Sequence, residues 1–196
     1  MTNALMWLRT FLVLLLPWMS GGIALGGEKD IAILVQKIDD AFIVDASLDV
    51  PAKLRNVWDV LTDFDHMPAF LSNLTSSSVV RREGNLLLVR QEGLARFGVF
   101  SFQFQSEREV RLEPMRRIFS KSLAGSYKRM ESETSLTPTG QSVQVKYHAE
   151  IVPDSTLARM FGIPFMRHEV EEQFTFMLDE MKRRERPAGL DQRPAD

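Results

Sequence analysis

Hydrophobic and polar residues alternate along much of the chain between residues 31 and 153, and this period of two is typical of β-strands. The clearest alternation places Phe100, Phe102 and Phe104 on one side of a strand and serine or glutamine on the other. A further strand is predicted within residues 31–50. Between residues 76 and 152 the pattern predicts about six strands, separated by turn signals at residues 83–85, 93, 113–114, 124–125 and 138–140. Strands joined by such short turns form an antiparallel sheet with one apolar and one polar face.

Two other segments have the 3.6-residue period of a helix. Leu54, Val57, Trp58 and Leu61 form an apolar stripe, and Pro51 is predicted to open this helix. Residues 63–68 break it, and residues 69–74 are predicted to form a second short helical turn. Helical spacing returns from residue 155, is interrupted at residues 162–164, and continues in a long helix to about residue 184. The apolar positions of that helix are Phe165, Met166, Val170, Phe174, Phe176, Met177 and Met181.

The order of the elements restricts the fold class. One strand, two short helices, about six strands and a long helix give a sheet with one apolar face and a single long helix to cover it. We therefore predict an α+β domain in which a curved antiparallel sheet wraps around the long C-terminal helix. Such an arrangement readily leaves a cavity between the sheet and the helix.

The N-terminal 26 residues differ from the rest. Arg9 is their only charged side chain, an apolar run follows at residues 10–18, and small residues follow that run. This order is typical of a secretory signal peptide, and the apolar run is shorter than the roughly 20 residues that span a bilayer. We predict a cleavable signal at residues 1–26, a single domain at residues 27–184, and a disordered polar tail at residues 185–196. The expected location is the periplasm, and the alternative is an uncleaved membrane anchor.

Composition excludes several classes of function. The chain has no cysteine, so disulfides, thiolate metal sites and lipid attachment at a cysteine are excluded. Loss of Arg9 with the signal would leave 23 basic residues against 26 acidic ones. This mildly acidic balance does not favour nucleic acid as a partner. Contact with a membrane surface stays open, without an anchor once the signal is removed.

Three segments resemble one protein superfamily. Residues 57–70, VWDVLTDFDHMPAF, resemble the helix and the aspartate, aromatic and proline turn of the helix-grip superfamily, and residues 89–93 and 127–131 resemble two further segments. START lipid-transfer domains and the birch-pollen allergen share this fold. The branch most similar to this chain is the polyketide cyclase/dehydrase and coenzyme-Q-binding-protein group. The resemblance covers residues 42–180 and implies a helix-grip fold, but Thr134 stands where related sequences often carry tryptophan.

Phenylalanine and methionine suit an apolar pocket, because both adapt to ligands of irregular shape. The alternative for each of them is ordinary core packing. The candidate pocket residues are Trp58, Phe100, Phe102, Phe104, Met130, Tyr147, Phe165, Val170, Phe174 and Met177. Arg90, Arg129 and Glu131 are the polar candidates that could orient the head of a ligand, beside Tyr147 on the inward register of its strand.

No local motif predicts a catalytic residue, a cofactor or a metal. His168 and Glu172 share a helix face, which allows two metal ligands, but position 172 is not the histidine that a helical zinc-protease motif requires. A solvated helix face with an i,i+4 pair is the favoured interpretation.

Three functions remain open. The first is an exported binding protein that holds a lipid, quinone or other apolar small molecule between the sheet and the long helix. The second is a cyclase or dehydratase that acts on a polyketide-like or aromatic substrate, with Tyr147, Glu131 or Arg129 as acid–base groups. The third is an interaction protein with a vestigial cavity. A strongly perturbed titratable group in the pocket would favour the enzyme, a dry cavity the carrier, and a filled core the interaction protein.

Overall fold

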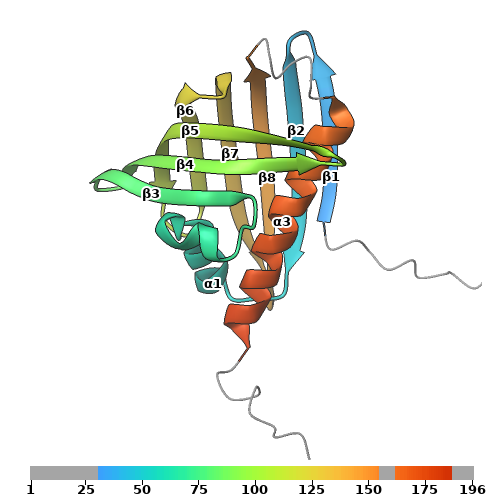
Figure 1. The fold of residues 1–196 in the computed structure, drawn as a ribbon. Helices are drawn as coiled ribbons and strands as arrows, with labels where there is room; N and C mark the ends of the chain where they lie inside the picture. Colours follow the sequence, from blue (N-terminus) through green and yellow to red (C-terminus); the bar gives the residue numbers. More distant parts are fainter. Residues whose placement is uncertain (1–30, 155–161, 187–196) are drawn as a thin grey trace, which may run out of the picture.

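One curved antiparallel sheet forms most of the domain (Figure 1). The computed structural model describes residues 31–154 and 162–186. The eight strands pair in the order β1-β2-β8-β7-β6-β5-β4-β3. Their bounds are β1 (Ile31–Ile38), β2 (Ala41–Val50), β3 (Leu74–Glu83), β4 (Leu86–Phe97), β5 (Phe100–Glu113), β6 (Arg117–Gly125), β7 (Tyr127–Thr139) and β8 (Ser142–Pro153).

The helices lie on the concave side of this sheet. Helix α1 (Leu54–Leu61) and the 3-10 helix η1 (Phe64–Ala69) connect β2 to β3, and the long helix α3 (Ile163–Glu185) follows β8. Figure 1 shows α3 running along the concave side, with β3, β4 and β5 curving around it. The predicted fold class, a helix-grip α+β fold, is confirmed.

The N-terminal half differs from the sequence prediction in three details. Residues 31–50 form two strands, because Asp39 and Asp40 make a tight turn in which Asp39 has φ of 54°. Helix α1 begins at Leu54 and not at Pro51, since the Ala52 N–H donates to the Val50 carbonyl at 2.8 Å and holds residues 50–52 in a turn. The second helical turn lies at residues 64–69 and not at residues 69–74.

Gly93 does not mark a turn, as the sequence predicted, but lies inside β4. A Cβ atom at this position would lie 2.2 Å from the Asn73 carbonyl oxygen and 2.4 Å from the Phe104 ring. Glycine therefore allows the chain before β3 to pass close to β4 and the ring to pack there. The turn between β4 and β5 lies at Gly98, which has φ of 59° and belongs to the left-handed region that favours glycine.

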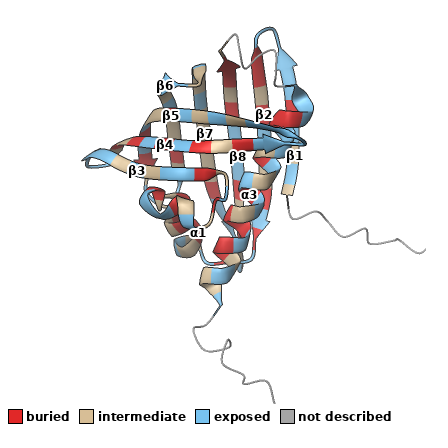
Figure 2. Cartoon of the chain, in the orientation of Figure 1, coloured by how far each residue is buried: buried red, intermediate tan, exposed pale blue. Residues whose placement is uncertain are grey.

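The core occupies the space between the concave face of the sheet and the helices (Figure 2). Because side chains alternate along a strand, every second residue points inward, as the burial pattern of β2 shows. The largest fully buried side chains include Phe42, Leu48, Leu71, Leu87 and Met181. This packing fixes α3 over the sheet.

An ion-pair network, which we call the α3 clamp, fastens the C-terminal end of α3 to the end of α1. It consists of Asp63, Glu180 and Arg184. The Arg184 guanidinium donates to Glu180 Oε1 at 2.6 Å and to Asp63 Oδ2 at 2.8 Å. Asp63 also pairs with His66 at 2.6 Å. Glu180 is only 7% exposed, so the clamp includes a buried charge with a fixed partner.

Three of the predicted segments cannot be compared with the structure. The signal at residues 1–26, the helical spacing at residues 155–161 and most of the tail at residues 185–196 lie outside the described residues. Within residues 31–154 and 162–186, no helix combines the length and the apolar character needed to cross a membrane.

Candidate functional site

A cavity of about 190 Å³ lies between the concave face of the sheet, η1 and α3. Its walls come from β4, β5, β6, β7, β8 and α3, together with residues at the ends of α1 and η1. Most of the surface is apolar and belongs to Leu61, Phe64, Met67, Leu74, Ala95, Phe102, Phe104, Val110, Ile118, Met130, Ile151, Phe165, Met166, Val170, Phe174 and Met177. This composition is typical of a site for an apolar small molecule.

A second, wider depression of about 500 Å³ lies on the outer face of the sheet over β1, β2, β7 and β8. Its side chains include Asp45, Lys146 and His148, and the His148 ring is 2.8 Å from Asp45 Oδ1. These groups are exposed to water. The depression is therefore an open, water-exposed part of the outer face, and we place the candidate site in the cavity under α3.

Eight of the ten predicted apolar pocket residues line this cavity. Phe174 packs its ring against Tyr147, with the ring centroids 5.2 Å apart. Phe102 packs edge to face against Phe165, with centroids 6.1 Å apart. The eight residues are Phe102, Phe104, Met130, Tyr147, Phe165, Val170, Phe174 and Met177. Sheet and helix thus place them around one space, and ligand binding by them stays a prediction.

Two predicted residues lie elsewhere. Trp58 belongs to the buried face of α1, is 8% exposed in the core, and does not line the cavity. Phe100 is 61% exposed, because it sits at the β4–β5 turn, beyond the part of β5 that α3 covers. Its ring stacks on Phe102 at 6.3 Å instead.

The polar candidates Arg90, Arg129 and Glu131 lie on the outer face and not in the cavity. In β7, Met130 and Ser132 point inward, so Glu131 between them must point outward. Each of the three pairs with an opposite charge on a neighbouring strand: Glu107, Glu150 and Lys121 respectively. Solvated ion pairs of this kind explain why these residues face water.

Apart from Tyr147, the polar groups that line the cavity were not among the predicted ones. Arg108 on β5 donates from Nη2 to Gln91 Oε1 at 2.5 Å, while its Nε is buried without a partner. Gln91 is in turn held by Ser77, to which it donates at 2.9 Å. Tyr127 lies on the same wall. The cavity therefore combines a large apolar surface with one buried guanidinium.

Both tyrosines of the cavity stay neutral at ordinary pH. Burial, together with the nearby Tyr147 and Glu169, raises the pKa of Tyr127 to about 12 against the opposing effect of Arg108. Burial also raises the pKa of Tyr147, against the effects of Arg108 and of a hydrogen bond with Ser132. The phenols can donate or accept hydrogen bonds but do not neutralise Arg108.

The sequence did contain a signal for Arg108. Phe102, Phe104, Ser106, Arg108 and Val110 occupy alternate positions of β5, so continuing the phenylalanine alternation by four residues leads to Arg108. A charged residue on the apolar register of a strand is uncommon and marks either a partner or a ligand.

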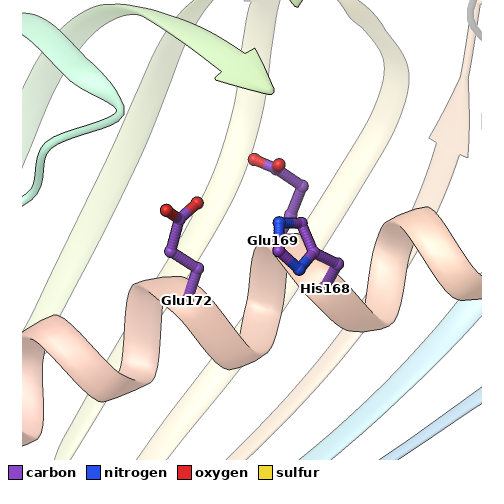
Figure 3. A group of neighbouring side chains, drawn as sticks. All are labelled: His168, Glu169 and Glu172. Atoms are coloured by element: carbon purple, nitrogen blue, oxygen red, sulfur yellow. The ribbon is translucent and has the colours of Figure 1, made fainter. Parts of the chain in front are cut away.

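Three side chains of α3 meet near the cavity (Figure 3). One ligand atom each of His168, Glu169 and Glu172 lies within 4.8 Å of the others. The sequence predicted a solvated face with His168 and Glu172, and His168 is indeed exposed, but Glu169 is half-buried and lines the cavity. Histidine and carboxylates are metal ligands in other proteins, yet exposed groups of this kind are common without a metal. The absence of a metal requirement stays a prediction.

Glu169 has the most perturbed carboxyl group of the site. Burial and the nearby charge of Glu172 raise its pKa to about 7, against the effects of Asn73 and of the Arg96 backbone. Figure 3 shows its carboxylate directed toward the end of a neighbouring strand. Glu169 is therefore partly protonated at neutral pH.

We expect this carboxyl group to make stability depend on pH. Because its pKa is higher in the folded chain than the ordinary value of 4.5, its contribution to stability is fully present below about pH 4.5 and is lost as pH rises through about 7. Glu169→Gln should remove this dependence. The difference in unfolding free energy between the variant and the wild type should grow by about 1 kcal/mol from pH 5 to pH 8, in favour of the variant.

Urea unfolding at both pH values measures the effect. Glu171→Gln, at the neighbouring exposed position, is the control and should change stability little at either pH. If Glu169→Gln and wild type showed parallel pH profiles, the carboxyl group would be solvated in the folded protein.

Comparison with known proteins agrees with this geometry. Residues 41–185 match the family described as polyketide cyclase / dehydrase and lipid transport. The chain belongs to this family. The matched residues include strands β2 to β8 and the whole of α3. Among curated proteins, no sequence matches the chain.

Several solved structures share the fold. A Streptomyces aromatase/cyclase, Zhui, has 17% identity and a TM-score of 0.66, and the match covers 76% of this chain and 98% of that one. A protein from Thermus thermophilus has 19% identity and a TM-score of 0.63, with 74% and 99% covered. A STAR-related lipid transfer protein from Xanthomonas axonopodis has 11% identity and a TM-score of 0.61, with 79% and 95% covered. At these identities the likeness shows the fold alone. The family and the apolar cavity together define a hydrophobic ligand-binding domain.

Proposed function

We propose that the protein is an exported carrier that holds a lipid-like or other apolar small molecule in the cavity between the sheet and α3. The observation that carries this proposal is the cavity itself, which α3 closes and whose surface is mostly phenylalanine, methionine and aliphatic side chains. The family description, which includes lipid transport, supports it. The order of charged, apolar and small residues at positions 1–26 supports export to the periplasm.

A cyclase or dehydratase is the second candidate. It is favoured by Glu169, whose pKa of about 7 suits a general acid or base, and by Tyr127 and Arg108 on the same cavity. Arg129 and Glu131 cannot serve as its acid–base groups, because both lie on the outer face. The likeness to the Streptomyces aromatase/cyclase supports this candidate at the level of the fold.

If the protein is a carrier, it should retain its ligand when it is purified from the cell envelope. Native mass spectrometry of the protein purified from the envelope should show a mature chain that begins near residue 25 or 27, together with one apolar molecule. Organic extraction should release that molecule. A bare chain that binds none of a panel of quinones and fatty acids would contradict the carrier, and a chain that begins at Met1 would contradict export.

A matched pair of variants locates the ligand. Val170 lines the cavity, whereas Glu171 is exposed. Val170→Phe fills part of the space and should reduce occupancy at least about twofold, provided that melting curves show a folded variant. Glu171→Phe should not change occupancy. Recovery of a chemically altered molecule after incubation with the wild type would favour the enzyme over the carrier.

A further inference from the structure

Strand β5 places Arg108 on the inner wall of the cavity. This residue follows Phe102, Phe104 and Ser106 on the inward register of β5. The side chain is fixed there by the hydrogen bond from Nη2 to Gln91 Oε1 at 2.5 Å. Gln91 is itself buried, at 7% exposure. The guanidinium is therefore part of an ordered wall and not a solvated side chain that happens to fold inward.

The positive charge of Arg108 has no anionic partner in the part of the chain that the structure describes. None of the ion pairs among the described residues involves Arg108, and the ionisable groups that affect its pKa are Tyr147 and Tyr127. Burial lowers the pKa of Arg108, but a guanidinium remains protonated in proteins. Both phenols are neutral because burial raises their pKa. Glu169 lines the same cavity but is not among the groups that shift the pKa of Arg108, so the wall holds a cation without an ion-pair partner.

A second polar group of the same wall lacks a partner. The Ser120 hydroxyl on β6 is buried without a hydrogen bond and lines the cavity. The β5–β6 register pairs Ser120 with Val110, two residues from Arg108 on the same face. A guanidinium with a buried, unpartnered Nε and no anion beside it, and a buried hydroxyl without a hydrogen bond, both cost free energy. A fold that keeps them together points to a group that arrives from outside.

We propose that the cavity takes an apolar molecule that carries one carboxylate, which binds head-first to Arg108 and Ser120. This inference rests on the proposed function, the binding of an apolar small molecule in this cavity. The Nε–H and the remaining Nη2–H lie along one edge of the guanidinium, and that edge matches the two oxygens of a carboxylate. The apolar body of the ligand then lies against Met130, Phe174 and Met177.

The size of the cavity favours a small acid. A volume of about 190 Å³ lies below the range of about 300–1,000 Å³ that is typical of sites for drug-sized ligands. A medium-chain fatty acid or a compact aromatic acid fits this size better than a two-chain lipid.

Calorimetric titration with decanoic acid and 1-decanol tests the inference, because the two ligands differ only in the head group. The wild type should bind decanoate at least about tenfold more tightly than decanol. Arg108→Met should weaken decanoate binding by about 10–100-fold, as expected for the loss of a charge-assisted bidentate contact, and should change decanol binding by less than about threefold. Arg111→Met, on the outer face of the same strand, should change neither.

One further variant and one further ligand complete the test. Arg108→Gln can keep a hydrogen bond to Gln91 without the charge, so it replaces Arg108→Met if that variant does not fold. Because both variants remove a cation without an ion-pair partner, the ligand-free variants should melt no lower than the wild type. Decyl phosphate, with its larger head, should bind more weakly than decanoate.

Each negative result of these titrations would overturn a different part of the proposal. Equal affinity of the wild type for decanoate and decanol, a variant that keeps full affinity for decanoate, or a lower melting temperature of both neutral variants would overturn the role of Arg108. Tighter binding of decyl phosphate would overturn the choice of a carboxylate. The proposed carrier function would survive each of these results. If the wild type bound neither ligand and contained no native one, both proposals would fall.

Discussion

Phe174→Ala should lower the free energy of unfolding of the ligand-free protein by about 3 kcal/mol and the melting temperature by about 6–12 °C. The Phe174 side chain is 6% exposed and packs on Tyr147, so its removal loses buried apolar surface and leaves a void. The expected cost lies at the low end for phenylalanine, because one side of the ring already faces the cavity. Thermal and urea unfolding measure the effect.

Thr175→Ala is the matched control, since Thr175 follows on the same helix but is exposed. Its hydroxyl donates only to the Glu171 carbonyl of the preceding turn, so its loss should change stability by less than about 0.5 kcal/mol. The enlarged cavity of Phe174→Ala should also accept a longer acid than the wild type accepts. Equal destabilisation by both variants would show that the buried face of α3 is assigned incorrectly.

Most of the fold could be predicted from the chain because its pairings are local. Six of the seven strand pairings join strands that follow one another in sequence, and turn signals such as Gly84 and Gly140 lie between such strands. The exception is the pairing of β2 with β8 across about 100 residues, as Val44 opposite Ala149 shows. Alternation alone cannot predict that contact, and the family resemblance supplied it. The split of residues 31–50 into β1 and β2 was missed because the alternation continues on both sides of the turn.

The apolar wall of the site was predictable from the alternation of residues along the strands, whereas its polar groups other than Tyr147 were not. Leu86, Leu87, Leu88 and Val89 are apolar at both registers of β4, so the sequence does not show which side Arg90 occupies. Arg108 follows two polar residues and resembles a solvated strand end in sequence. The phenylalanine alternation does place Arg108 on the inner face of β5, but the curvature of the sheet, which carries β5 across the cavity, is needed to show that this face is enclosed.

Arg184→Met should lower the free energy of unfolding by about 2 kcal/mol. The substitution removes the cation of the α3 clamp while retaining the aliphatic part that covers the Phe70 ring, 5.6 Å from the guanidinium carbon. Glu180 then keeps only Arg183, and Asp63 keeps only His66. Because Glu180 is 7% exposed, its charge is stabilised mainly by fixed partners and not by water. Urea unfolding at neutral pH measures the loss.

The effect of Arg184→Met should shrink in acid. Hydrogen bonds from Arg183 and Arg184 lower the pKa of Glu180 against the effect of burial. Burial would raise the pKa of Asp63, but His66 and Arg184 lower it overall. Stability from carboxylates with lowered pKa is present above their ordinary values near 4 and is lost as pH falls through the folded values. The two proteins should therefore differ less at pH 3 than at pH 7.

Arg183→Met is the control and should have a much smaller effect, because the Arg183 side chain is 68% exposed. A loss as large as that of Arg184→Met would mean that the Glu180 charge alone, and not the link to Asp63, fastens α3 to the end of α1.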